Sequence, residues 1–326
     1  MRSLYRLSIA FLVLVLGALP ALGQPRPNWP RSVTIGSASI GGVYHVVAGG
    51  YVKIIQEKMS IAASNRVTGG PVQNIQLVHA KQIEVGMTTM GPAFEGYQGI
   101  GWARGTPHNT IRFTWPMYTS FAHWVTRADS GIRSVADLGG RTVDLGPRGG
   151  SAEFVGTKVF ELFGIRPRRI VNLSFAEGAN ALRDGLVDAN FGVIGIPVPA
   201  WLELSITRPV RFFGFTPDQI NRITEEFPYL SPAAIRANVY RGQDQVIRTV
   251  QMWNAAFVHR DMPDDFVYEL TKTIFENQET LMTVHPTSAE TTPVNIFYIN
   301  LPLHPGAIRL YQERRVQLRP TQMPPR

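Results

Sequence analysis

The sequence contains no cysteine among its 326 residues. It therefore offers no disulfide bridge, no thiol nucleophile and no thiolate ligand for a metal ion. An exported protein can still fold stably by burying apolar surface alone, and 44% of these residues are hydrophobic. The absence of cysteine thus excludes several kinds of chemistry and leaves the cellular compartment open.

Recognisable catalytic and metal-binding motifs are also missing. We find no nucleophile elbow, dinucleotide fingerprint, zinc-binding helix or phosphate-binding loop, and residues 146–151 lack the lysine that a phosphate-binding loop needs. The seven histidines are dispersed and show no paired ligand spacing. The sequence therefore predicts no cofactor, no metal site and no enzymatic activity.

Only one long apolar run is present, and it lies at the N-terminus. Arg2 and Arg6 precede or flank the apolar residues 7–19, and a small-x-small site follows at residues 21–23. This pattern predicts a signal peptide over residues 1–23, a mature chain from Gln24 and export to the periplasm. An uncleaved membrane anchor is the alternative, but the run is well short of the ~20 residues that span a bilayer.

Positive charge is in modest excess. The chain has 32 lysines and arginines against 24 aspartates and glutamates, and its formal net charge is +8. The cations are scattered along the chain and form no stripe or known nucleic-acid motif. We therefore expect no nucleic-acid partner. The excess is compatible with an anionic ligand.

A strand, a glycine-rich turn and a helix follow one another three times along the chain. Such alternation predicts an α/β fold with mainly parallel sheets flanked by helices, whose ligand lies beyond the carboxyl ends of the strands. The predicted strands and helices pair as residues 33–36 with 44–59, 62–67 with a helix from Pro71, and 141–145 with 152–163.

The pattern also predicts two lobes with a cleft between them. Residues 111–125 form a long β-type run interrupted by Pro116, which suits a strand that crosses between lobes with a hinge near Thr119. Residues 211–215 are expected to return the chain, and residues 244–284 are expected to be mostly helical. The predicted division is residues 24–119 for the first part of lobe I, 120–210 for lobe II, and 211–326 for the return to lobe I with C-terminal helices.

The three glycine-rich turns are the candidate ligand sites. Each combines small or hydroxyl residues with a helix N-terminus, whose N–H groups favour a carboxylate. In the second turn Asn74 adds an amide, and in the third Arg148 adds a guanidinium that pairs well with carboxylates. Tight turns without a ligand, a helix cap at Asn74 and a solvent-exposed Arg148 are the alternatives. Sequence alone does not show that the three turns converge.

The same segments carry a family resemblance that runs through most of the mature chain. Residues 35–44, 68–74 and 304–313 together resemble the TAXI family of extracytoplasmic solute receptors that serve TRAP transporters. Residues 129–143 are similar to a segment shared by many type II periplasmic receptors, including those of ABC transporters. This second likeness supports the fold more than the type of transporter.

The resemblance implies a two-lobed periplasmic-binding-protein type II fold that closes on a small organic acid. In the family this ligand is often a glutamate-like amino acid or a dicarboxylate, which a monomeric receptor delivers to an ion-driven TRAP-type permease. Together with Arg148, the positions carried over by the resemblance give the candidate ligand-binding set Ser39, Gly41, Tyr44, Asn74, Arg148, Gly150, Ser151 and Ile196.

Departures from the family pattern leave the ligand open. His45 stands where a second aromatic residue is common, Ala152 where threonine often follows the serine, and residues 87–91 replace a more polar strand end. A receptor for an ABC permease or a sensor kinase is the first alternative function. An enzyme on a similar two-lobed fold is the second.

Overall fold

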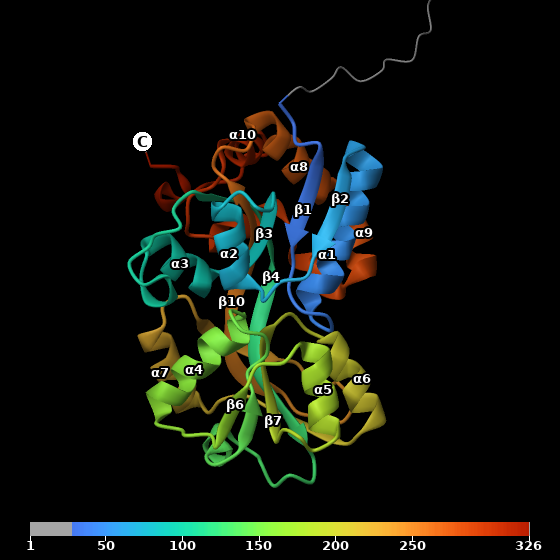
Figure 1. Ribbon diagram of the computed structural model, residues 1–326, viewed down its shortest axis with the longest axis vertical. Helices are drawn as coiled ribbons and strands as arrows, with labels where there is room; N and C mark the ends of the chain where they lie inside the picture. Colours follow the sequence, from blue (N-terminus) through green and yellow to red (C-terminus); the bar gives the residue numbers. More distant parts are fainter. Residues whose placement is uncertain (1–27, 326) are drawn as a thin grey trace, which may run out of the picture. The chain divides into compact units, whose positions relative to one another are not determined.

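The computed structural model describes residues 28–325, so the predicted signal peptide lies outside the described residues. Its centre is a ten-stranded sheet in which eight strands run in the order β2-β1-β3-β10-β4-β7-β5-β6, while β8 pairs with β4 and β9 with β10 (Figure 1). The strands are β1 Ser32–Gly36, β2 Ala62–Arg66, β3 Val85–Thr89, β4 Ile111–Arg127, β5 Thr142–Asp144, β6 Arg169–Val171, β7 Ala189–Ile194, β8 Val210–Phe213, β9 Ser231–Ile235 and β10 Ile247–His259.

Helices flank this sheet, which confirms the predicted α/β class. Residues Arg31–Arg326 form one compact unit. None of the helices among residues 28–325 is long and apolar enough to cross a membrane. The α-helices are α1 Val43–Ile54, α2 Pro71–His79, α3 Met90–Gln98, α4 Ser151–Phe163, α5 Phe175–Arg183, α6 Pro199–Thr207, α7 Pro217–Glu226, α8 Asp264–Glu276, α9 Gln278–Val284 and α10 Pro305–Glu313.

The sheet is mixed, with parallel pairs on its two sides and antiparallel pairs in its middle. β1 pairs in parallel with β2 and β3, and β5 pairs in parallel with β6 and β7. Between these groups, the long strands β4 and β10 pair with each other and with their neighbours in the antiparallel sense. β4 continues through Pro116, opposite an irregular register at Ala255, where a residue without an N–H is tolerated.

The prediction of a mostly helical segment over residues 244–284 is wrong for its first part. β10 occupies Ile247–His259, and the first helix of this region begins only at Asp264. Ala255, Ala256, Phe257 and Val258 are all fully buried. A strand covered on both faces loses the alternation that identifies a strand in a sequence, because both sets of side chains are apolar.

Residues 211–215, where the sequence predicts that the chain returns, include most of β8. β8 pairs with the Trp124–Arg127 end of β4. Phe213 and Phe215 pack in one hydrophobic cluster with Trp124 and Phe191, and Val250 and Met252 belong to the same cluster. β8 and the first half of β10 therefore share one hydrophobic cluster with β4.

Local sequence patterns predict helix ends in this chain better than they predict which strands pair. The predicted capping box of α5 is confirmed: the Ser174 hydroxyl accepts a hydrogen bond from the Glu177 N–H, and the Glu177 carboxylate accepts one from the Ser174 N–H. The short elements β6, α3 and α6 show no clear apolar period in the sequence, so no local pattern predicts them.

Candidate functional site

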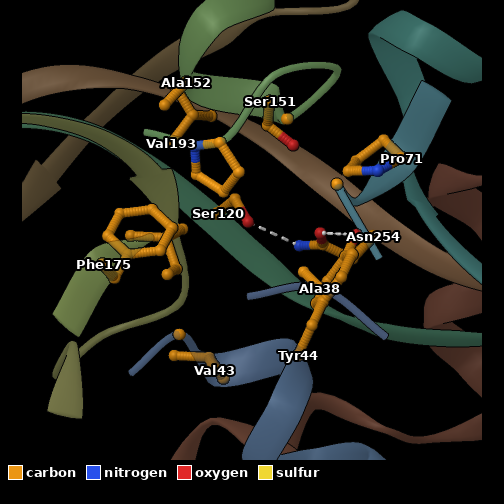
Figure 2. Close-up of a pocket in the computed structure, with 15 residues that line it drawn as sticks. Ala38, Val43, Tyr44, Pro71, Ser120, Ser151, Ala152, Phe175, Val193 and Asn254 are labelled. Carbon is orange, nitrogen blue, oxygen red and sulfur yellow. Dashed lines mark hydrogen bonds between the residues drawn. The ribbon is translucent and has the colours of Figure 1, made fainter. Parts of the chain in front are cut away.

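A small cavity lies where helix N-termini from both sides of the sheet meet. Its walls come from the first residues of α1, α2, α4 and α5, from β7, and from Ser120 of β4 and Asn254 of β10. Figure 2 shows Phe175 and Val193 on one side of this space and Tyr44 and Asn254 on the other. The cavity has a volume of about 40 Å³.

None of the 15 lining residues carries a charged side chain. The cavity is therefore polar only through hydroxyls, one amide and the peptide groups of its walls. Any charge that enters must be stabilised by these dipoles, because burying an ion without partners is costly.

The start of α1 forms one wall of the cavity. Its N-cap is Gly42, which has no side chain to accept a hydrogen bond from the first turn. The preceding Gly41 has φ +84°, and a Cβ there would lie 2.7 Å from the Ala176 nitrogen. The N–H groups of the first helical turn have no partner within the helix, so they are available to a ligand.

Ser39 lies in the same loop, between the cavity-lining residues Ala38 and Gly42. Its side chain is buried, and its hydroxyl is without a hydrogen-bond partner within residues 28–325. An unsatisfied buried hydroxyl costs free energy, about 1–3 kcal/mol. Ala38 and Gly42 line the cavity and Ser39 does not, so the Ser39 hydroxyl is an unused donor in the loop beside the cavity.

The start of α4 also lines the cavity, and like α1 this helix has a glycine as its N-cap. Gly150 is its N-cap and supplies no side-chain acceptor. Ser151 directs its hydroxyl into the cavity (Figure 2) and lies 3.0 Å from the Thr89 hydroxyl. Two uncapped helix N-termini thus converge on one space, and their partial positive charges favour an anion there.

A hydrogen-bonded network closes the side of the cavity opposite Phe175. The Tyr44 hydroxyl donates to Asn254 Oδ1 at 2.6 Å, and Asn254 Nδ2 donates to the Ser120 hydroxyl at 2.8 Å and to the Tyr118 carbonyl at 2.7 Å. Burial raises the pKa of Tyr44 well above its usual range, so its hydroxyl stays protonated. The Ser120 hydroxyl, already an acceptor, retains a proton to donate.

Sequence reasoning missed Ser120 and Asn254. Ser120 lies in the crossing strand without any motif around it, and Asn254 lies in the segment wrongly predicted to be helical. An amide in the middle of a strongly apolar run was the available signal, since a buried amide needs partners.

Asn74 does not face the cavity. Its side chain is fully buried, and Nδ2 donates to the Ser37 carbonyl at 2.7 Å and to the Met87 carbonyl at 2.9 Å, while Oδ1 accepts from the Thr68 hydroxyl at 2.8 Å. Both amide protons are therefore used. Asn74 ties α2 to the ends of β1 and β3 and positions the loop that carries Ser39.

Some of the other predicted ligand-binding residues line the cavity, and others lie outside it. Of the predicted set, Tyr44, Gly150 and Ser151 line the cavity, and Ser39 and Gly41 lie in its α1 loop. The Arg148 side chain is exposed, and neither it nor Ile196 is part of the lining. At the α2 N-terminus the Val72 N–H is already used, because it donates to the Gly149 carbonyl at 3.1 Å.

Further contacts join the two walls around the cavity. The Ala176 and Ala200 N–H groups, at the starts of α5 and α6, donate to the carbonyls of Ile40 and Gly41 at 3.4 and 3.3 Å. On the other flank, Lys158 of α4 forms a 3.0 Å ion pair with Glu95 of α3, whose side chain is only 8% exposed. Within residues 28–325, no group of three histidine, aspartate or glutamate side chains could hold a metal ion.

Proteins of known structure share this architecture. The chain matches MatC from Rhodopseudomonas palustris with bound malate at a TM-score of 0.56 and 13% identity, over 87% of this chain and 97% of that one. It matches the periplasmic binding protein BugD at a TM-score of 0.54 and 13% identity, over 88% of this chain and 95% of that one. These likenesses establish a shared fold, and residues 35–314 match the model of the NMT1-like family. The chain belongs to the NMT1-like family.

Proposed function

We propose that this protein is a periplasmic solute-binding receptor that captures a small organic acid by lobe closure and delivers it to a TRAP-type permease. The observation that carries the proposal is the buried, uncharged cavity on which the uncapped N-termini of α1 and α4 converge. A carboxylate is one of the anions that helix N-termini bind. The fold shared with BugD and malate-bound MatC gives independent support.

The hydrophobic clustering suggests where the proposed lobes divide. We place residues 31–119 and 253–325 in lobe I and residues 120–252 in lobe II, since Ala122, Trp124, Val250 and Met252 share one core. This moves the proposed return from residue 211 to the middle of β10. The hinge then lies where β4 and β10 pair, between the pairs Thr119–Trp253 and Ser120–Met252.

With these lobes, α1 belongs to lobe I and α4 to lobe II, so the ligand receives donors from both only when they close. The contacts of Ile40, Gly41 and Val72 with lobe II are then closure contacts, as is the Glu95–Lys158 pair. Ligand shifts the population towards the closed state by its extra affinity for that state. No bond of the ligand needs to break, and none of the lining side chains is a charged acid or base.

A pair of neighbouring serines tests the proposal. Ser39→Ala should weaken binding of the acid about 10- to 100-fold, because it removes a hydrogen bond to a charged group, while it should leave stability equal or raise it. Ser37→Ala is the matched control: the Ser37 hydroxyl donates to the Arg66 carbonyl at 3.1 Å, so this change should lower stability by about 1 kcal/mol. It should change affinity less than threefold or so.

The measurement is a thermal-shift screen of mono- and dicarboxylates, oxoacids and amino acids, followed by calorimetric titration with the acid that raises the melting temperature most. If no acid binds, or if a bound acid is chemically converted, the receptor proposal fails. Uptake in proteoliposomes then separates the partners: transport driven by an ion gradient supports the TRAP-type permease, whereas dependence on ATP points to an ABC permease.

A further inference from the structure

We infer that the ligand carries one negative charge and no positive charge: it is a short monocarboxylate with an apolar tail. This inference rests on the proposed function and narrows it. The family resemblance implied a glutamate-like amino acid or a dicarboxylate, and both would bring a second charged group into the cavity. The composition of the walls argues against both.

A second carboxylate would have no cation to meet. The lining contains no arginine, lysine or histidine, and the Arg148 side chain is exposed outside it. The two free helix N-termini converge on one place and so serve one carboxylate. A buried ion without a partner weakens binding strongly, because its hydration is lost and not replaced.

An ammonium group would be equally unpaired. The lining contains no aspartate or glutamate, and the one side-chain amide oxygen, Asn254 Oδ1, already accepts the Tyr44 hydroxyl. The Asn254 amide protons are committed to Tyr118 and Ser120. Both Asn254 amide protons are thus used without a ligand, whereas the Ser120 hydroxyl proton remains a free donor at the site, which suits an anion.

The cavity has an apolar end on the side away from Asn254, beside the N-cap Gly42 of α1. Phe175, Val193 and Ile194 form it, with Val43 from the first turn of α1 beside them. Figure 2 shows Phe175 and Val193 together on the side away from Asn254, with the Ser151 hydroxyl between the two sides. A ligand with a charged head and a short hydrocarbon tail matches this division. The volume of about 40 Å³ limits the tail to a few atoms.

Four three-carbon compounds test the inference with nearly constant size. Propionate carries the single charge, L-alanine adds an ammonium, malonate adds a second carboxylate, and propionamide removes the charge. By calorimetric titration of the purified protein at pH 7.5, we expect propionate to bind at least about 100-fold more tightly than L-alanine or malonate. Propionamide should bind at least about 10-fold more weakly than propionate, since it makes no charge-assisted hydrogen bonds.

The outcomes separate this inference from the proposed function. Binding of L-alanine, malonate, glutamate or succinate as tightly as propionate would overturn the inference and leave the receptor proposal standing. Absence of binding by every acid would overturn both. Propionamide binding as well as propionate would show that the helix N-termini do not select a charge, and the inference would fall on that result too.

A variant of the apolar end gives a second readout. Phe175→Leu should open space at the start of α5, and the affinity ratio of pentanoate to propionate should rise at least about fourfold for each added methylene that becomes buried. Phe163→Leu is the control, since Phe163 lies at the far end of α4 beneath Arg222 and outside the lining. An unchanged ratio in Phe175→Leu would place the tail elsewhere and contradict the assignment of this end.

Discussion

Asn74→Asp should destabilise the protein by at least about 4 kcal/mol at pH 8, since a fully buried carboxyl can have its pKa raised by three units or more. The substitution replaces two N–H donors by an oxygen that faces the carbonyl oxygens of Ser37 and Met87, which now lie 2.7 and 2.9 Å from Nδ2. The new carboxyl must then stay protonated in the folded protein or accept this repulsion. Because the folded state holds the extra proton, the variant should lose stability as the pH rises.

Denaturant unfolding at pH 5 and pH 8 measures both effects. Asn74→Ala should cost about 3 kcal/mol at either pH, because it removes the same hydrogen bonds without adding a charge. Asn221→Asp on the exposed face of α7 is the control and should stay within about 0.5 kcal/mol of the wild type. An Asn74→Asp variant as stable as the wild type would return Asn74 to the ligand-facing role that its position in the turn suggested.

Asn74 illustrates what a sequence can and cannot specify. The Gly-Gly-Pro turn before it correctly predicted the start of α2 at Pro71, because glycine and proline act on the local backbone. The direction of the side chain depends on where β3 lies, since the Met87 carbonyl is one of its acceptors. That position is set by the whole sheet. All three turns contribute residues to the cavity lining for the same reason, and no local signal in the sequence predicts that they meet.

The site also draws on residues that sequence reasoning placed in the wrong element. Asn254 lies in β10, whose continuous apolar run from Ala255 to Val258 suits a buried helix as well as a buried strand. The partner that decides between them is β4, far away in the sequence. By contrast, the helices after Gly42 and Gly150 were predicted to within one residue of their starts at Val43 and Ser151, because a strand, a tight turn and a helix leave a local pattern.

Asp144→Asn should stabilise the protein at pH 8 by up to about 4 kcal/mol, the product of a pKa shift of roughly three units and 1.36 kcal/mol per unit. Asp144 ends β5 and is 2% exposed. Burial raises its pKa to about 7, and the N–H groups of Leu173 and Gly146, each 3.0 Å from Oδ1, offset that shift only partly. These two N–H groups belong to the loops that lead into α4 and α5, so this carboxyl positions the part of the cavity wall that those two helices form.

The sign of the pH effect follows from the direction of the shift. The folded protein holds the Asp144 proton up to about pH 7, whereas the unfolded chain releases it near pH 4, so wild-type stability falls as the pH rises between these values. Asp144→Asn keeps an oxygen for both N–H groups and should lose this slope, with ligand affinity retained. Unfolding free energies of the wild type and of Asp144→Asn at pH 4.5, 6 and 8 test this difference in slope.

Asp137→Asn is the control with the opposite sign, because backbone hydrogen bonds from Arg133 and Ser134 lower the pKa of Asp137. A wild-type protein whose stability does not fall between pH 4.5 and 8 relative to Asp144→Asn would show that this carboxylate is charged and paired in the folded state.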